Sequence, residues 1–267
     1  MTKTFNWKIF FILFAAATIG LVAVIPYSLA LQGPGAAAQA AAQTSMPVPL
    51  LITIQIGAQV ILFGIATWIG LSFANSIGLG LPILEARLKG EPVGQKIKAI
   101  LPISIILGVV GALLIVLLDL LVFHPALLAQ LGEAAKPLTV KSATTPTWWQ
   151  GLLASFYGGI DEEILLRLCV MSFLAWLGRF VSKTAQGTPT VAVFWVANVL
   201  AAILFGLGHL QATALLLPIT PLVVLRAIVL NSIVGIAAGY LYFTRGLESA
   251  MLSHFSADIV LHVLLAI

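Results

Sequence analysis

The hydrophobic positions of this chain form long runs that are separated by short polar segments, and within the runs apolar and polar residues do not alternate. A helix that crosses the hydrocarbon core of a bilayer needs about 20 apolar residues, whereas barrel strands are about ten residues long and alternate. The pattern therefore predicts transmembrane helices. The runs that are long enough cover residues 9–31, 48–77, 97–123, 149–178, 191–217, 221–243 and 247–267.

The composition agrees with this pattern. Of the 267 residues, 61% are hydrophobic and only 8% are charged, whereas a soluble domain has about 25% charged residues. A chain with so few polar residues cannot cover the surface of a soluble globule, and it is neither a disordered chain nor a coiled coil. We predict an all-α, polytopic helical membrane protein with about seven transmembrane helices.

The basic residues between the predicted helices indicate their orientation. Lys and Arg accumulate in cytoplasmic loops, so the net charge of +4 does not require a nucleic-acid partner. Only Lys136 and Lys141 fall on one side of the predicted membrane. The positive-inside rule predicts that the N-terminus lies in the cytoplasm and the C-terminus outside. It also predicts a basic cytoplasmic loop over residues 85–98. The side with the basic excess holds Lys3, Lys8, Arg87, Lys89, Lys96, Lys98, Arg179, Lys183 and Arg245.

The N-terminal region allows two interpretations. Basic residues precede the first hydrophobic run, and residues 27–30 resemble a signal-peptidase site. The run is longer than the apolar part of a signal peptide, which has about 7–15 residues, and this favours a retained helix. Residues 32–47 contain Gly, Ala, Gln and Pro without a charge and predict a flexible connector.

Ionisable residues interrupt the predicted helices at a few positions, mostly in the fourth, fifth and seventh. A charge at the bilayer centre costs about 2.5–3.5 kcal/mol, so each of them needs a reason. Such residues form either a functional site or a charge network that holds helices together. They are Asp119, Asp161, Glu162, Glu163, Arg167, His209, Arg226, His254, Asp258 and His262.

The fourth predicted helix carries consecutive carboxylates. Glu163 precedes Arg167 by four residues, which is the favourable order for an ion pair within a helix. Glu162 points about 100° away from Glu163 and lacks that partner. Burial makes a carboxylate a stronger base, as a general base near neutral pH requires. A purely structural charge network is the alternative.

The fifth and seventh helices carry histidines. Gly206 and Gly208 precede His209 and predict the close approach of another helix or of a substrate backbone. A single histidine near a helix end is more often only a hydrogen-bonding group. His254 and Asp258 share one helix face, so Asp258 can orient His254. His262 follows on nearly the same face and is more readily interpreted as part of a proton-relay or packing stripe.

Together these residues form three motifs in a fixed order, which are Glu162-Glu163-x-x-x-Arg167, Phe205-x-x-x-His209 and His254-x-x-x-Asp258. They resemble the motifs of the CAAX protease and bacteriocin-processing (CPBP) family of intramembrane peptidases, which includes relatives of the Ras-converting CAAX endopeptidase. The resemblance implies an N-terminal three-span region with a basic loop, residues 1–148, and a peptidase core, residues 149–267. The active site would lie between the fourth, fifth and seventh helices.

The resemblance also implies a role for each motif residue. Glu162 would activate a water with assistance from His209, and Glu163 and Arg167 would hold the region of Glu162 in place. His254 and Asp258 would contact the oxyanion of the tetrahedral intermediate. Many family members have Asn where this chain has Asp258, and an ionised Asp has no proton to donate. Asp258 must therefore be protonated or act by orienting His254.

The expected activity is that of an intramembrane endopeptidase without a cofactor. It would cleave a membrane-associated, prenylated or leader-type substrate and would bind the lipid bilayer but no nucleic acid. Zinc bound by Glu162, His209 and His254 is the alternative, although the chain lacks a His-Glu-x-x-His pattern. A carrier, or a non-catalytic immunity or scaffold protein, could use the same charges. The chain shows no inverted repeat of the kind that many carriers have.

Overall fold

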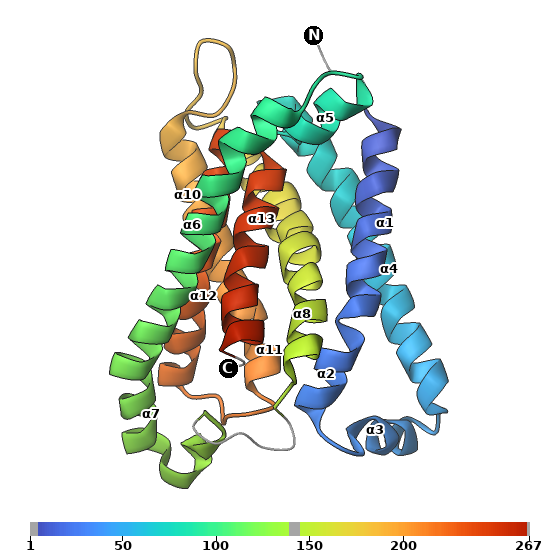
Figure 1. Ribbon diagram of the computed structural model, residues 1–267, viewed down its shortest axis with the longest axis vertical. Coiled ribbons are helices and arrows are strands. Elements are labelled where there is room, and N and C mark those ends of the chain that lie inside the picture. The colour runs from blue at the N-terminus through green and yellow to red at the C-terminus, as the bar shows by residue number, and fades with distance from the viewer. Residues whose placement is uncertain (1–4, 139–144, 266–267) are drawn as a thin grey trace.

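The computed structural model describes residues 5–138 and 145–265, and these residues form a bundle of helices (Figure 1). The first half contains α1 (Trp7–Ala23), α2 (Ile25–Gln32), α3 (Ala36–Thr44), α4 (Val48–Ile77), α5 (Pro82–Leu88), α6 (Gly94–Leu118), the π-helical turn η1 (Asp119–Phe123), α7 (His124–Leu131) and the 3₁₀ segment η2 (Gly132–Leu138). The second half contains α8 (Trp148–Phe156), the π-helical segments η3 (Tyr157–Glu162) and η4 (Ile164–Met171), α9 (Ser172–Gly178), α10 (Val191–Gly208), α11 (Leu210–Thr213), α12 (Pro221–Arg245), α13 (Leu247–Asp258) and the π-helical turn η5 (Ile259–Leu264).

Five helical stretches of the described residues are long and apolar enough to cross a membrane. The other two predicted spans are also helical, continuously from residue 148 to 178 and from residue 247 to 264, but they carry most of the ionisable residues. The prediction of an all-α, polytopic membrane protein is confirmed, while length and composition alone do not settle the exact number of spans. The five stretches cover residues 7–32, 48–77, 94–135, 191–213 and 221–245.

The predicted connector and the predicted basic loop are more helical than expected. Residues 36–44 form α3, because alanine and glutamine are strong helix formers even without a hydrophobic face. The prediction of a flexible connector over residues 32–47 was therefore wrong for most of its length. Within residues 85–98, α5 and the first turn of α6 occupy all but a short turn.

The C-terminal helices form the centre of the bundle. In Figure 1, α13 lies between α6 and α8, and α10 and α12 pack along one another behind it. The helices α1 and α4 cover the other side, where α4 packs on η4 and α1 on η3. Leu13, Ile164 and Leu168 are almost fully buried in the hydrophobic core that these helices share.

Close packing at the end of α10 depends on one of the two predicted glycines. A Cβ atom on Gly206 would collide with the backbone of Ile228 on α12, so only glycine allows this approach. A Cβ atom on Gly208 would meet nothing within 4 Å. The close approach of another helix is thus confirmed for Gly206, whereas no other helix approaches Gly208 in this way, and the approach of a substrate backbone there stays a prediction.

Basic residues from distant parts of the chain meet at one end of the bundle. Arg179 donates to the carbonyl oxygen of Ser76 (3.4 Å), and Arg245 donates to the carbonyl oxygen of Ala99 (3.4 Å). Both contacts lie at the end where α5 crosses the bundle, at the top of Figure 1. The grouping agrees with the predicted charge asymmetry, and the assignment of this end to the cytoplasm stays a prediction. Two of the charges used for it, Lys3 and Lys141, lie outside the described residues.

Candidate active site

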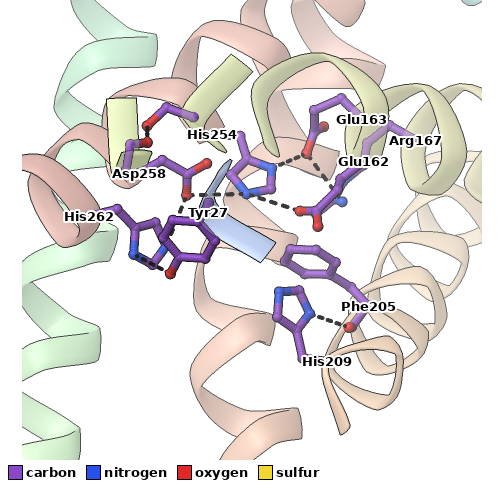
Figure 2. Close-up of polar contacts among 11 residues, drawn as sticks. Tyr27, Glu162, Glu163, Arg167, Phe205, His209, His254, Asp258 and His262 are labelled. Atoms are coloured by element: carbon purple, nitrogen blue, oxygen red, sulfur yellow. Dashed lines mark hydrogen bonds and ion pairs between the residues drawn. The ribbon is translucent and has the colours of Figure 1, made fainter. Parts of the chain in front are cut away.

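The three motifs converge in the middle of the bundle (Figure 2). The helix of residues 148–178 contributes the two glutamates and the arginine, α10 ends at the motif histidine, and α13 presents the remaining pair on one face. The side chains that sequence analysis selected thus come from three separate helices. They are Glu162, Glu163, Arg167, His209, His254 and Asp258.

A buried ion pair forms the base of this site. Glu163 and Arg167 are fully buried, and Arg167 Nη1 lies 3.2 Å from Glu163 Oε1. Arg167 Nη2 donates to the carbonyl oxygen of Gly235 on α12 (2.8 Å), and its guanidinium lies 5.1 Å from the ring centre of Phe205 on α10. The predicted pair between Glu163 and Arg167 is present. It also ties the fourth span to the two helices that pack beside it.

His254 is held by a carboxylate from the facing helix. Its Nδ1 lies 2.7 Å from Glu163 Oε1, and because an ionised carboxylate only accepts, Nδ1 carries the proton. His254 Nε2 then faces Glu162 Oε2 at 3.6 Å and Asp258 Oδ1 at 3.7 Å. The expectation that Asp258 orients His254 needs correction, because the short hydrogen bond comes from Glu163. Asp258, one turn along the same helix, reaches only the other nitrogen.

Glu162 has the most accessible carboxylate of the cluster. Its side chain is 19% exposed, compared with 11% for Asp258 and 0% for Glu163. The guanidinium of Arg167 is committed to Glu163, so Glu162 faces an imidazole instead of a fixed cation. This is the arrangement expected of a carboxylate that can take a proton from water.

Asp161 points away from the other two carboxylates of its triplet. It is fully buried where η3 packs on α1, and a Cβ atom on Gly20 would collide with its carboxylate. Among the described residues, neither of its oxygens has a hydrogen-bond partner. Asp161 is therefore a residue of the helix interface and does not line the site.

His209 reaches the cluster through an aromatic ring. Its Nδ1 donates to the carbonyl oxygen of Phe205 (2.9 Å), and the two ring centres are 4.6 Å apart. The ring of Phe205 also contacts the ring of His254, at 5.4 Å between centres, and Figure 2 shows it between the two histidines. The neighbour that His209 shares with His254 is thus apolar, and a neutral His209 keeps the lone pair of Nε2 available.

A glycine that the motifs do not include makes this geometry possible. A Cβ atom on Gly158, in η3, would collide with the carboxylate of Asp258 and would lie 3.4 Å from His254 Nε2. Only glycine at this position lets α13 bring both side chains against the fourth span. The site also lies along π-helical segments, which often occur at functional sites because each adds a residue to one turn.

Two further residues border Asp258, and sequence analysis assigned a site role to neither. His262 Nε2 lies 4.0 Å from Asp258 Oδ1, and His262 Nδ1 lies 3.4 Å from the hydroxyl of Tyr27. His262 was interpreted as part of a proton-relay or packing stripe. Tyr27 is in α2, and because it is so distant in the sequence, no motif spacing could connect it with this site.

The three residues considered for zinc are not arranged as a ligand set. The Phe205 ring lies between His254 and His209, with its centre 5.4 Å and 4.6 Å from the centres of their rings. Over residues 5–138 and 145–265, no group of three or more His, Cys, Asp or Glu side chains could hold a metal ion. The absence of a cofactor stays a prediction, with zinc as the alternative.

Comparison with known proteins connects the site to a protease family. Residues 144–260 match the family described as Type II CAAX prenyl endopeptidase Rce1-like, and this segment contains all three motifs. No curated protein and no solved structure matches the chain significantly. Residues 144–260, which carry Glu162, His209 and His254, are therefore similar to the CAAX-type intramembrane peptidases of the CPBP family.

Proposed function

We propose that this protein is an intramembrane endopeptidase that hydrolyses a peptide bond with a water activated by Glu162. The observation that carries the proposal is the convergence, inside an apolar bundle, of a partly exposed Glu162 and a His254 whose Nδ1 is held by Glu163. A base and an oriented imidazole facing one another are the groups that peptide hydrolysis needs.

In this mechanism Glu162 removes a proton from the attacking water, a step that contributes about 10²–10⁴-fold to the rate. His254 presents Nε2 toward the same space, and in its protonated form the Nε2–H donates a hydrogen bond to the developing oxyanion. Glu162 then gives the proton that it took from water to the leaving amine nitrogen as the C–N bond breaks. His209 assists through its free Nε2. Arg167 offsets the charge of Glu163, which is needed because two further carboxylates lie within 4 Å of His254.

The location of the site restricts the substrate. The site lies among helices whose outer faces are apolar, so the scissile bond must be presented at membrane depth. We infer a membrane-associated, prenylated or leader-type peptide as substrate, with no cofactor and no nucleic acid. We infer that the N-terminus lies in the cytoplasm and the C-terminus outside, from the excess of Lys and Arg on one side. Residues 149–267 are the proposed peptidase core, and residues 1–148 cover it, because α1 packs on η3 and α6 on α13.

The matched pair Glu162→Gln and Asp161→Asn tests the assignment. Each variant replaces one carboxylate with its amide at neighbouring positions, but only Glu162 faces His254. In nanodiscs, with a library of membrane-anchored peptides, Glu162→Gln should lower turnover by about 10²–10⁴-fold with a normal folded yield, because an amide is not a useful base. Asp161→Asn should cleave like the wild type. Equal turnover of Glu162→Gln and wild type would refute the base assignment.

Loss of folded yield in both variants, with unchanged specific activity, would instead favour a scaffold protein that uses these charges for packing. A carrier would show substrate-dependent flux in proteoliposomes without the appearance of cleaved peptide. Either result would overturn the proposed function.

A further inference from the structure

Asp258 is flanked by a histidine on each side along its own helix. His254 precedes it by four residues and His262 follows it by four, with Nε2 atoms 3.7 Å and 4.0 Å from Asp258 Oδ1. Beyond His262 lies Tyr27 of α2, whose hydroxyl is 3.4 Å from His262 Nδ1 and whose ring meets the imidazole edge to face. Tyr27 and His262 together form an arm beside Asp258, and Figure 2 shows this arm on the side of Asp258 opposite to Glu162.

Both members of the arm are anchored on the first turn of α8. Gln150 Nε2 donates to the carbonyl oxygen of Pro26 (3.0 Å), directly before Tyr27. Gln150 Oε1 also accepts from the backbone N–H of Thr147 (2.7 Å), so the side chain that holds α2 is itself fixed by the start of α8. A Cβ atom on Gly151 would collide with the carbonyl oxygen of His262, which shows how closely η5 lies on the same turn.

The chemistry of the arm determines which nitrogen of His262 carries the proton. A tyrosine hydroxyl can donate or accept. With the Tyr27 hydroxyl as donor, the neutral imidazole of His262 accepts at Nδ1 and has its proton on Nε2, which faces a carboxylate oxygen. That proton faces Asp258 Oδ1. Asp258 then interacts with the Nε2–H of His262, on the side of Asp258 opposite to Glu162. His254 Nε2 is correspondingly left for Glu162 and the substrate.

We propose that Tyr27 and His262 form a positioning pair that holds the Asp258 carboxylate and thereby keeps His254 available for catalysis. The proposal rests on the proposed function and extends its site to a residue of the N-terminal helices. Tyr27 and His262 both lie outside residues 144–260, the segment that matches the family. The pair is therefore a feature of this chain that the family match does not include.

The conservative variant Tyr27→Phe tests the hydroxyl alone, because phenylalanine keeps the ring contact with His262. We expect kcat to fall about two- to tenfold, the effect of losing one net hydrogen bond in the transition state, with KM within about twofold of wild type. Tyr240→Phe is the matched control, since that ring stacks on Trp195 instead. A kcat of Tyr27→Phe equal to that of Tyr240→Phe would overturn the proposal.

A double-mutant cycle tests whether the two residues act through one another. His262→Leu removes both polar contacts, and in its background Tyr27→Phe should have almost no further effect on kcat. His262→Gln retains a donor and an acceptor and should recover part of the activity that His262→Leu loses. Independent, multiplicative losses in the double variant would contradict a pair.

Nitrogen NMR of the histidine side chains provides a readout that does not depend on cleavage. With ¹⁵N-labelled histidine, the His262 signals are assigned from the spectrum of His262→Gln. We expect the Nε2–H tautomer in the wild type and a shifted Nδ1 signal in Tyr27→Phe. An unchanged Nδ1 signal would overturn the pair. A wild type that cleaves no peptide would refute the proposed function, and the NMR result would still decide whether the pair exists.

Discussion

Two carboxylate–arginine pairs lie within the predicted spans of this protein, and they are built differently. In the first, Arg226 on α12 binds Asp119 of η1 with two parallel hydrogen bonds of 2.7 Å, and both side chains are about one-fifth exposed. In the second, Glu163 and Arg167 are fully buried, their contact is 3.2 Å, and each has a further partner. Glu163 holds His254, and Arg167 holds the carbonyl oxygen of Gly235.

The Asp119–Arg226 pair is a clamp, that is, a link between two helices, whereas the Glu163–Arg167 pair is part of the candidate active site. A bidentate arginine–carboxylate pair uses the directional capacity of both groups on one another, which suits a link between two helices. The Glu163–Arg167 pair instead leaves the carboxylate free to orient an imidazole, and Glu163 Oε2 has no hydrogen-bond partner among the described residues. In this buried network Glu163 contacts both Arg167 and His254, so the arrangement depends on all three side chains.

Removal of the arginine from either pair should have the largest effect on stability, and the loss should differ between the two pairs. Arg167→Ala strands the buried Glu163 and should lower the free energy of unfolding by about 3–5 kcal/mol. Arg226→Ala should cost clearly less, because the side chain of Asp119 is about one-fifth exposed and is not enclosed by protein as Glu163 is. Unfolding in mixed micelles with increasing SDS measures both variants. Equal losses would mean that burial does not distinguish the two pairs.

Conversion of each carboxylate to an amide should separate activity from stability. Glu163→Gln should lower specific activity by at least about tenfold, because an amide partner no longer selects the productive tautomer of the imidazole. Asp119→Asn should leave specific activity unchanged. The measurement is the initial rate of peptide cleavage per folded molecule, with folded protein quantified by size-exclusion chromatography. Full activity of Glu163→Gln would remove the proposed link between Glu163 and His254.

Replacement of a whole pair by leucines sharpens the contrast. Asp119→Leu with Arg226→Leu removes two charges together and should change the free energy of unfolding by only about 1 kcal/mol in either direction, because apolar side chains of similar volume often replace an ion pair without loss. Its activity should remain. The same replacement of Glu163 and Arg167 should abolish activity. An inactive Asp119–Arg226 double variant would show that the clamp also belongs to the site.

Chelation should have the smallest effect. The Phe205 ring lies between His209 and His254, and the donor atoms of Glu162, His209 and His254 do not form a compact set. Treatment of the purified protein with a strong chelator should therefore leave cleavage unchanged. Measurement of zinc content and activity before and after treatment checks this. Stoichiometric zinc whose removal abolishes cleavage would contradict the cofactor-free mechanism.

Local patterns predicted much of this structure correctly. The hydrophobic run over residues 48–77 has the same bounds as α4, because a span must satisfy its backbone internally and needs a minimum apolar length. The Glu163–Arg167 pair follows from helical spacing, since residues four apart share a face. The order of the three motifs along the chain was enough to indicate the family.

Contacts between helices could not be predicted in this way. Asp161 and Glu162 are neighbours in the sequence, yet one is buried against α1 and the other faces His254. Glu163 binds His254 across a helix interface, so the expectation that Asp258 fills this role was wrong. The π-helical segments contribute to the mismatch, because each shifts the faces that ideal helical periodicity would assign.

The sequence by itself determined the helical class, the positions of most spans and the residues that carry the motifs, because these depend on apolar length, local spacing and residue type. Only the tertiary structure decided which carboxylate meets which histidine, that Gly158 admits Asp258, and that Tyr27 reaches His262. The physical reason is that these contacts depend on how deeply and at what rotation each helix packs against its neighbours. The depth and rotation of each helix are set by the whole bundle, so the periodicity of a single segment does not reveal them.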